Sequence, residues 1–314
     1  MPFFSIIIPL YNKEEHIVNT LQSVFDQNYD DYEIIIINDG STDTSHQLVS
    51  NIENDKIRYF LTKNNGVSSA RNYGIKKAIG KLVAFLDADD YWYPNHLEII
   101  SQLYNKFPKA GLYATSYTKK FNQKSIFLAS FKNIIADSSS FIIVDDYFES
   151  SSIDAIAFSS ACAIPISVLT SMNGFDTTIT HGEDTDLWVR IALQYQIAFA
   201  TFVTASHNLN ATNRSKDVDI MRKEFLNFSK FEKEEKHNPS LKKYLDANRY
   251  SIALQYRTAG EYLSAKNYLQ NIDYNNLSWK HRFLIKQHKT ILVILKKIQI
   301  MITNLLGIHL SSFK

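Results

Sequence analysis

Apolar and polar positions alternate in blocks along the first two-thirds of the chain. Short continuous apolar runs predict buried strands over residues 3–8, 33–37, 57–61, 82–86 and 112–117. Between these runs, apolar residues recur at three- and four-residue spacing, which predicts helices over 14–27, 43–53 and 67–79, with another beginning near Pro94. Apolar strands that alternate with helices are typical of a mostly parallel sheet with helices on both faces. The pattern therefore predicts an α/β fold.

The remainder of the chain shows different patterns. Serine clusters between short apolar patches in residues 130–160 predict long loops with short elements. A helix is expected over 184–195 and a strand over 197–203. From residue 217 onward the spacing is helical throughout, over 217–236, 241–257, 259–271 and 279–306. We therefore expect an α/β domain over 1–215 and an all-helical domain over 216–314, which ends in a basic amphipathic tail.

Composition narrows the class of protein. Of the 314 residues, 45% are hydrophobic and 21% are charged, which indicates a packed protein and excludes wholesale disorder. The single cysteine, Cys162, excludes an intrachain disulfide and a zinc site built from several cysteines. The first apolar run has no basic leader and no apolar stretch is long enough to span a bilayer, so we expect neither an export signal nor a membrane-spanning helix.

Charge is distributed unevenly, although the net charge is only +2. Residues 1–215 carry 16 Lys and Arg against 23 Asp and Glu, a net charge of −7, whereas residues 216–314 carry 18 against 9, a net charge of +9. The basic amphipathic segment 279–306 predicts binding to an anionic membrane surface. The alternatives are that this segment packs on the α/β domain or on a second copy of the chain. Nucleic acid is not expected as a partner, because the basic residues are not interleaved with aromatic ones on a recognisable module.

Ligands of doubly wound sheets bind beyond the carboxyl ends of the strands. Asn38–Asp43 follows one predicted strand there, and Asp39 either accepts hydrogen bonds from a ligand or belongs to an ordinary turn and helix cap. Asp87-Ala88-Asp89-Asp90 follows another strand. Three carboxylates in four residues repel one another unless they share a cation, so this cluster predicts a Mg²⁺ or Mn²⁺ site, with a solvated acidic turn as the alternative.

A third acidic cluster, Glu183-Asp184-Thr185-Asp186, opens a predicted helix. The helix dipole stabilises carboxylates in a first turn, and the same position keeps an acid ionised so that it can act as a general base. Arg71 is the basic residue that complements these clusters. Its guanidinium can pair with an anionic substrate or with one of the acidic turns, and spacing does not decide between them.

Several catalytic motifs are absent from the sequence. No Gly-x-Gly-x-x-Gly follows a strand, which argues against a dinucleotide oxidoreductase. The phosphate-binding Gly-x-x-x-x-Gly-Lys-Ser/Thr loop, the Gly-x-Ser-x-Gly nucleophile elbow and the His-Glu-x-x-His zinc motif are also missing.

Five motifs in a fixed order resemble the inverting family 2 glycosyltransferases with a GT-A fold. The resemblance covers roughly residues 3–215. The motifs are Ser5-Ile6-Ile7-Ile8-Pro9-Leu10-Tyr11-Asn12, Asn38-Asp39-Gly40-Ser41-Thr42-Asp43, Asn64 to Gly74 with Ala70-Arg71-Asn72, Asp87-Ala88-Asp89-Asp90, and Glu183-Asp184-Thr185-Asp186-Leu187.

The resemblance implies a role for individual residues. Asp39 matches the acid that hydrogen-bonds the base, usually uracil, and Arg71 matches a residue near the base or phosphate. Asp87 matches the first acid of the family's Asp-x-Asp motif, which faces ribose or sugar hydroxyls. The matches that line the nucleotide pocket are Pro9, Tyr11 and Glu14.

The resemblance also implies the catalytic and metal-binding residues. Asp184 matches the catalytic base and Glu183 its partner. Asp89 matches the acid that binds Mn²⁺ or Mg²⁺, and His207 matches a histidine that some members place beside the metal and diphosphate, although Ser206-His207-Asn208 is a poor copy of that motif.

The expected activity is transfer of a hexosyl or N-acetylhexosaminyl group from a nucleotide-diphosphate sugar, UDP-linked in the usual case, to a hydroxyl of a glycan or lipid-linked acceptor. The pathway implied is the synthesis of bacterial surface polysaccharide, in the cytoplasm or on the inner face of the cytoplasmic membrane. Two alternatives are a sugar-phosphate nucleotidyltransferase and a non-catalytic nucleotide-sugar-binding protein. The first would carry a Gly-rich basic loop where this chain has Pro9–Lys13, and intact Asp39, Asp89 and Asp184 argue against the second.

Overall fold

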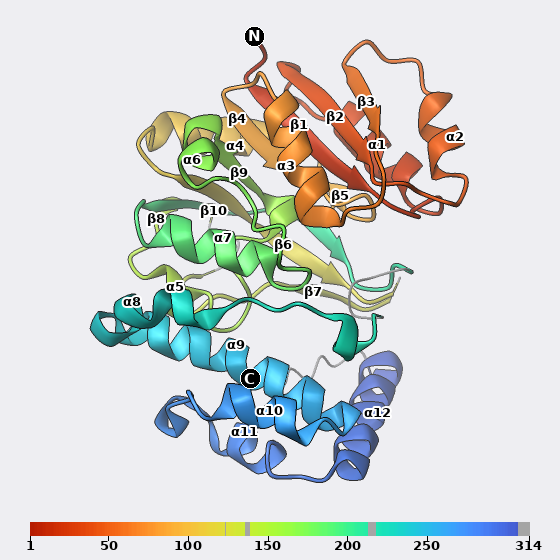
Figure 1. Ribbon diagram of the computed structural model, residues 1–314. Helices are drawn as coiled ribbons and strands as arrows, with labels where there is room; N and C mark the ends of the chain where they lie inside the picture. Colours follow the sequence, from red (N-terminus) through yellow and green to blue (C-terminus); the bar gives the residue numbers. More distant parts are fainter. Residues whose placement is uncertain (123, 136–138, 213–217, 307–314) are drawn as a thin grey trace.

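The computed structural model describes residues 1–122, 124–135, 139–212 and 218–306. Their strands form one mixed sheet (Figure 1). Its order is β3 (Ile57–Leu61), β2 (Tyr32–Asn38), β1 (Phe4–Leu10), β4 (Leu82–Phe85), β9 (Cys162–Pro165), β6 (Leu112–Lys120), β10 (Ile197–Asn208) and β5 (Tyr91–Trp92). At the side, β7 (Ile126–Leu128) pairs with β6, and β8 (Phe141–Ile143) pairs with β10.

The parallel half of the sheet follows the predicted apolar runs. β1 pairs in parallel with β2 from Phe4↔Tyr32 to Leu10↔Asn38, and with β4 on its other side. The isoleucines of β1 and β2 are fully buried because helices cover both faces. β9 then runs antiparallel between β4 and β6, although the sequence pattern did not predict this strand. The prediction of an α/β fold with a mostly parallel mixed sheet is confirmed.

Two pairs of helices cover the sheet. The segment that follows α1 (Ile17–Phe25) is joined to the start of α4 (His96–Lys106), because the side chain of Gln27 accepts a hydrogen bond from the Leu97 amide and donates one to the Tyr93 carbonyl. α3 (Val67–Lys77) and α7 (Glu183–Ala192) lie over the opposite face, toward the viewer in Figure 1. The shorter helices are α2 (Ser45–Ser50), α5 (Tyr147–Ser150), α6 (Ile166–Ser171) and the 3-10 turn η1 (Ser159–Ala161).

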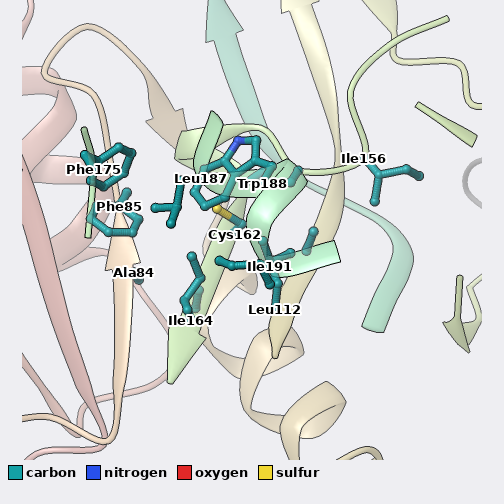
Figure 2. Packing of buried hydrophobic residues seen from close by; sticks show 14 of the residues in the cluster. Ala84, Phe85, Leu112, Ile156, Cys162, Ile164, Phe175, Leu187, Trp188 and Ile191 are labelled. Atoms are coloured by element: carbon teal, nitrogen blue, oxygen red, sulfur yellow. The ribbon is translucent and has the colours of Figure 1, made fainter. Parts of the chain in front are cut away.

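The apolar stripe of α7 anchors this helix on the centre of the sheet. Leu187, Trp188 and Ile191 are at most 2% exposed and pack toward Cys162 and the neighbouring strands (Figure 2). This burial fixes the direction of α7, and with it the place of the helix's acidic first turn.

The C-terminal part of the chain is helical, and its helices lie below the sheet in Figure 1. Within the described residues, no helix is both long and apolar enough to cross a membrane. That 1–215 and 216–314 are separate domains stays a prediction. The elements are η3 (Ile220–Arg222), η4 (Phe228–Phe231), α8 (Glu232–His237), α9 (Pro239–Ala259), α10 (Tyr262–Leu269), η5 (Tyr274–Asn276), α11 (Trp279–Leu284) and α12 (Lys289–Leu306).

Two predicted helices were wrong in extent. The segment 217–236 is not one helix over its described part, because Phe225 forms a parallel bridge with His181 and the Glu224 carbonyl accepts the Thr180 amide. The segment 279–306 divides into α11 and α12. Arg257 donates a hydrogen bond to the Gln287 carbonyl, and this tertiary contact holds the chain in a turn between the two helices.

Candidate active site

The loops that follow β1 and β2 are joined at the carboxyl edge of the sheet. Asn12 has a left-handed backbone (φ 50°), and its side-chain oxygen accepts the Thr42 amide at 2.7 Å. Glu14 accepts hydrogen bonds from the amide and hydroxyl of Thr44, at 2.8 and 2.5 Å, so its carboxylate holds the second loop at the start of α2. Tyr11, in the first of these loops, is 37% exposed.

Asp39 organises the loop that follows β3. Its carboxylate is 4% exposed and accepts the amides of Asn65 and Gly66 at 2.9 and 2.8 Å. Gly66 has a φ of +87°, which a residue with a side chain would adopt only with strain. The Thr62 hydroxyl is a third donor to Asp39, at 3.4 Å. A carboxylate has about four acceptor positions, so one remains after these three bonds. The structure thus shows the turn-forming role of Asp39, and its contact with a base stays a prediction.

The three carboxylates that follow β4 have three different partners. Asp87 pairs with Arg71 at 2.8 Å, and Asp89 pairs with Lys13 at 2.9 Å. Asp90 is buried and accepts hydrogen bonds from the Ser160 hydroxyl at 2.6 Å and the Asn208 amide at 2.8 Å. Burial, followed by repulsion from the two neighbouring carboxylates, raises the pKa of Asp90 well above its usual range. The cluster is therefore not a uniformly solvated turn.

Arg71 joins two of the predicted acidic clusters. Its Nη2 donates to Asp87 and its Nη1 donates to Glu183 at 2.9 Å. The guanidinium also lies 5.2 Å from the centre of the Phe175 ring, and the whole residue is 3% exposed. Of the two interpretations that spacing left open, the structure shows pairing with the acidic turns. The loop after β4 and the start of α7 consequently face one site.

Asp184 lies in the first turn of α7, and its Oδ1 accepts the Thr185 amide at 2.6 Å. The adjacent Glu183 is more enclosed, with a side chain that is 13% exposed. Burial and the Asp184 charge raise the pKa of Glu183 to about 7, while Arg71 opposes this shift. Glu183 thus changes its charge near neutral pH, directly beside the predicted base.

The charge of Asp184 acts on three buried tyrosines, and sequence patterns gave no indication of them. Tyr117 on β6 and Tyr147 on α5 have their pKa raised well above the usual range by burial, with a further contribution from the Asp184 charge. Burial and the same charge raise the pKa of Tyr244, on α9, to about 12. The helical part of the chain therefore contributes to the surroundings of Asp184.

Lys13 is a further residue that sequence patterns missed. Its ammonium donates to Asp89 and, at 2.7 Å, to the Thr212 carbonyl. Lys13 stands at the end of the first motif, but 76 positions separate it from Asp89, and no local pattern indicates such a contact. The side chains of this pair are 12% and 13% exposed, so a cation is held beside Asp89 in a largely enclosed place.

The predicted metal site fits a cation that is shared with substrate phosphates. Within the described residues, no three His, Cys, Asp or Glu side chains are grouped to hold a metal ion. Mg²⁺, however, is commonly held by one or two carboxylates and completed by phosphate oxygens, which is a role that Asp89 can fill. His207 lies on β10 next to Asn208, the amide partner of Asp90, and its ring stacks on Phe158 at 4.4 Å. Metal binding by Asp89 and His207 stays a prediction.

Comparison with known proteins identifies the class. Residues 5–155 match the family model of glycosyl transferase family 2. A glycosyltransferase of Rickettsia felis, named as uncharacterized, is 37% identical over 200 residues, which cover 62% of this chain and 31% of that protein. A Bacillus subtilis relative, provisionally named for teichuronic acid biosynthesis, is 39% identical over 100 residues, covering 31% of this chain and 40% of the relative. The resemblance to family 2 is confirmed over residues 5–155, which match the model of that family.

The fold extends beyond the matched residues. A crystal structure of Staphylococcus aureus TarS 1–349 in complex with UDP-GlcNAc superposes with a TM-score of 0.63, covering 94% of this chain and 92% of that one at 17% identity. This likeness shows a GT-A fold. The aligned regions span about a third or less of the length of the first Rickettsia relatives, so the activity of the whole protein is a matter for proposal.

Proposed function

We propose that this protein is an inverting, metal-dependent glycosyltransferase. It would move a hexosyl or N-acetylhexosaminyl group from a nucleotide-diphosphate sugar to a hydroxyl of a glycan or lipid-linked acceptor. The observation that carries the proposal is the double pairing of Arg71, which holds Asp87 and Glu183 at a single site. Donor-side and acceptor-side carboxylates are thereby brought together from segments about a hundred residues apart.

In the proposed reaction, the carboxylate of Asp184 removes the proton from the acceptor hydroxyl. The hydroxyl oxygen attacks the anomeric carbon, and the bond from that carbon to the diphosphate breaks on the opposite face. The nucleoside diphosphate leaves with the bonding electron pair, so one displacement inverts the configuration. Asp184 suits this role because it lies in the first turn of α7, beside Glu183, and the apolar stripe of the helix keeps that turn in place.

Asp89 is the residue that would hold Mn²⁺ or Mg²⁺, with His207 as its proposed companion. The metal, when bound, neutralises charge on the leaving diphosphate. The Lys13 ammonium contacts one oxygen of Asp89. When a metal takes this carboxylate, Lys13 would pair with the substrate phosphates instead. Asp87 would face the ribose or the sugar hydroxyls while Arg71 restrains its orientation.

A UDP-sugar is the donor that we propose. Asp39 would contact the base, and Pro9, Tyr11 and Glu14 would line the nucleotide pocket at the same edge of the sheet. TarS, which shares the fold, has been crystallised with UDP-GlcNAc. The pathway that we propose is synthesis of a bacterial surface polysaccharide, in the cytoplasm or on the inner face of the cytoplasmic membrane. The Bacillus relative that is provisionally named for teichuronic acid biosynthesis supports the pathway but not the location.

A screen of nucleotide sugars for Mn²⁺- or Mg²⁺-dependent release of nucleoside diphosphate tests the proposal. Asp184→Asn should lower turnover by about 10²- to 10⁴-fold, the usual contribution of a general base, with donor affinity retained. Asp89→Ala should weaken metal-dependent donor binding instead. The control is Asp55→Asn, an exposed carboxylate before β3. Full activity of Asp184→Asn would remove the base assignment, and release of pyrophosphate would show a nucleotidyltransferase.

A further inference from the structure

α12 is attached to the rest of the chain at its beginning. The Nζ of Lys289 donates a hydrogen bond to the Ala259 carbonyl at the end of α9, and its amide contacts the Tyr262 hydroxyl. Leu292, 5% exposed, is the apolar residue that α12 buries in this contact. The first turns of α12 therefore pack on α9, within the helical part of the chain, and packing on the α/β domain or on a second copy stays untested.

The rest of α12 exposes an apolar stripe. Its members recur at a spacing of three and four residues, so they share one face of the helix, and their exposed fractions lie between 38% and 53%. This stripe is defined by Ile291, Ile294, Leu295, Ile298 and Met301. A contiguous row of large exposed apolar side chains is uncommon on a protein surface unless something covers it.

Charge identifies what can cover the stripe. Lys296 and Lys297 are exposed on α12, and Lys286 is exposed just before it. Residues 274–314 contain seven basic residues and no acidic one, so this end of the chain repels another copy of itself and attracts an anionic surface. An apolar face beside unpaired lysines is the arrangement of helices that lie flat in the interface of an anionic bilayer.

We propose that α12 binds the surface of an anionic lipid membrane, with the stripe inserted at the headgroup boundary and the lysines on the lipid phosphates. The 18 residues of α12 make a helix about 27 Å long. No helix in the described part of the chain is long and apolar enough to cross a bilayer, so α12 would lie along the surface. Binding through this surface does not depend on which reaction the active site performs.

Cosedimentation of the full chain with vesicles tests this proposal. Vesicles of phosphatidylcholine that contain about 30% phosphatidylglycerol should bind the protein. Binding should weaken when salt is added, and it should be weaker on vesicles of pure phosphatidylcholine. Each lysine near such a surface contributes roughly fivefold, so Lys296→Gln with Lys297→Gln should weaken binding about 30-fold. Ile294→Gln with Ile298→Gln should weaken it by roughly tenfold or more.

Matched controls come from exposed residues elsewhere on the described surface. Ile79→Gln replaces an isoleucine that is 52% exposed, close to the 51% of Ile294, and Lys109→Gln with Lys124→Gln removes two other exposed lysines. These controls should bind vesicles as the wild type does, and unchanged thermal unfolding would show that all the variants fold. Equal binding by the stripe variants and wild type would overturn the proposal. So would self-association through the stripe without vesicle binding.

Discussion

Glu183 accepts a 2.9 Å hydrogen bond from the guanidinium of Arg71, a residue 112 positions earlier in the chain. The same guanidinium pairs with Asp87, so Arg71 fixes the separation between the loop after β4 and the first turn of α7. A planar guanidinium presents several donors in a fixed geometry, which a single ammonium cannot reproduce. The shape of the proposed site therefore depends on one buried side chain.

Replacing Arg71 should damage stability and activity together. Arg71→Met leaves Asp87 and Glu183 without their shared cation, and we expect a loss of about 3 kcal/mol in the free energy of unfolding, measured with urea. Arg71→Lys should restore part of the stability but not the transfer rate, because one ammonium cannot hold both carboxylates. Lys132→Met, which breaks a much more exposed pair with Glu149, should cost under about 1 kcal/mol. Equal losses in the two Met variants would contradict a special role for Arg71.

The pKa of Glu183 predicts a pH-dependent stability. Because burial and Asp184 raise this pKa to about 7 from an ordinary value of 4.5, the folded protein binds a proton that the unfolded chain has already lost. This stabilisation is complete below pH 4.5 and disappears as the pH rises through 7. Between pH 5 and 8, Glu183 should therefore lower the free energy of unfolding by on the order of 2 kcal/mol.

Glu183→Gln isolates this contribution, since glutamine cannot ionise. Urea unfolding of the variant at several pH values should lack the component between 5 and 8 that the wild type shows. Glu98→Gln is the control, because Glu98 lies in the first turn of another helix, α4. If the Glu183 contribution instead made the free energy of unfolding rise between pH 5 and 8, the pKa of Glu183 would not be raised in the folded protein.

Sequence patterns predicted the parallel half of the fold because its strands are buried on both faces. β1, β2 and β4 each appear as a continuous apolar run, which leaves little ambiguity. β9 escaped prediction because it has four residues among serine-rich loops, and β5 has only two. Such strands form through their partners rather than through local preference.

The candidate site was predictable in its acidic residues and not in their partners. Motif order placed Asp87, Asp89 and Asp184 at strand or helix ends, where the structure has them. The contacts of Lys13 and Ser160 depend on how distant segments meet, at sequence separations of 76 and 70 residues. Periodicity carries information about a side chain's own element, so it is silent about contacts of this kind.

Ser160 positions the loop that carries the three carboxylates. Its hydroxyl donates to Asp90 and accepts the Asp87 amide at 3.0 Å, and the residue is completely buried. Ser160→Ala leaves two buried polar groups without this partner, so we expect a loss of about 2 kcal/mol in the free energy of unfolding and weaker donor binding. The neighbouring buried Ser159 provides the control. A Ser159→Ala variant that weakens donor binding equally would indicate a general packing defect rather than a positioning role for Ser160.

Lys230 ties the helical part of the chain to α7. Its ammonium lies 2.5 Å from an oxygen of Asp186, which is fully buried two residues after Asp184, and Arg190 pairs with the other oxygen of the same carboxylate. Lys230→Met removes one of these two cations, so we expect a loss of about 2 kcal/mol in the free energy of unfolding and faster amide hydrogen exchange in the first turn of α7. Lys233→Met alters an exposed lysine on α8 and should change neither quantity. If α7 exchanges at the same rate in both variants, the helical part does not hold the proposed catalytic base in place.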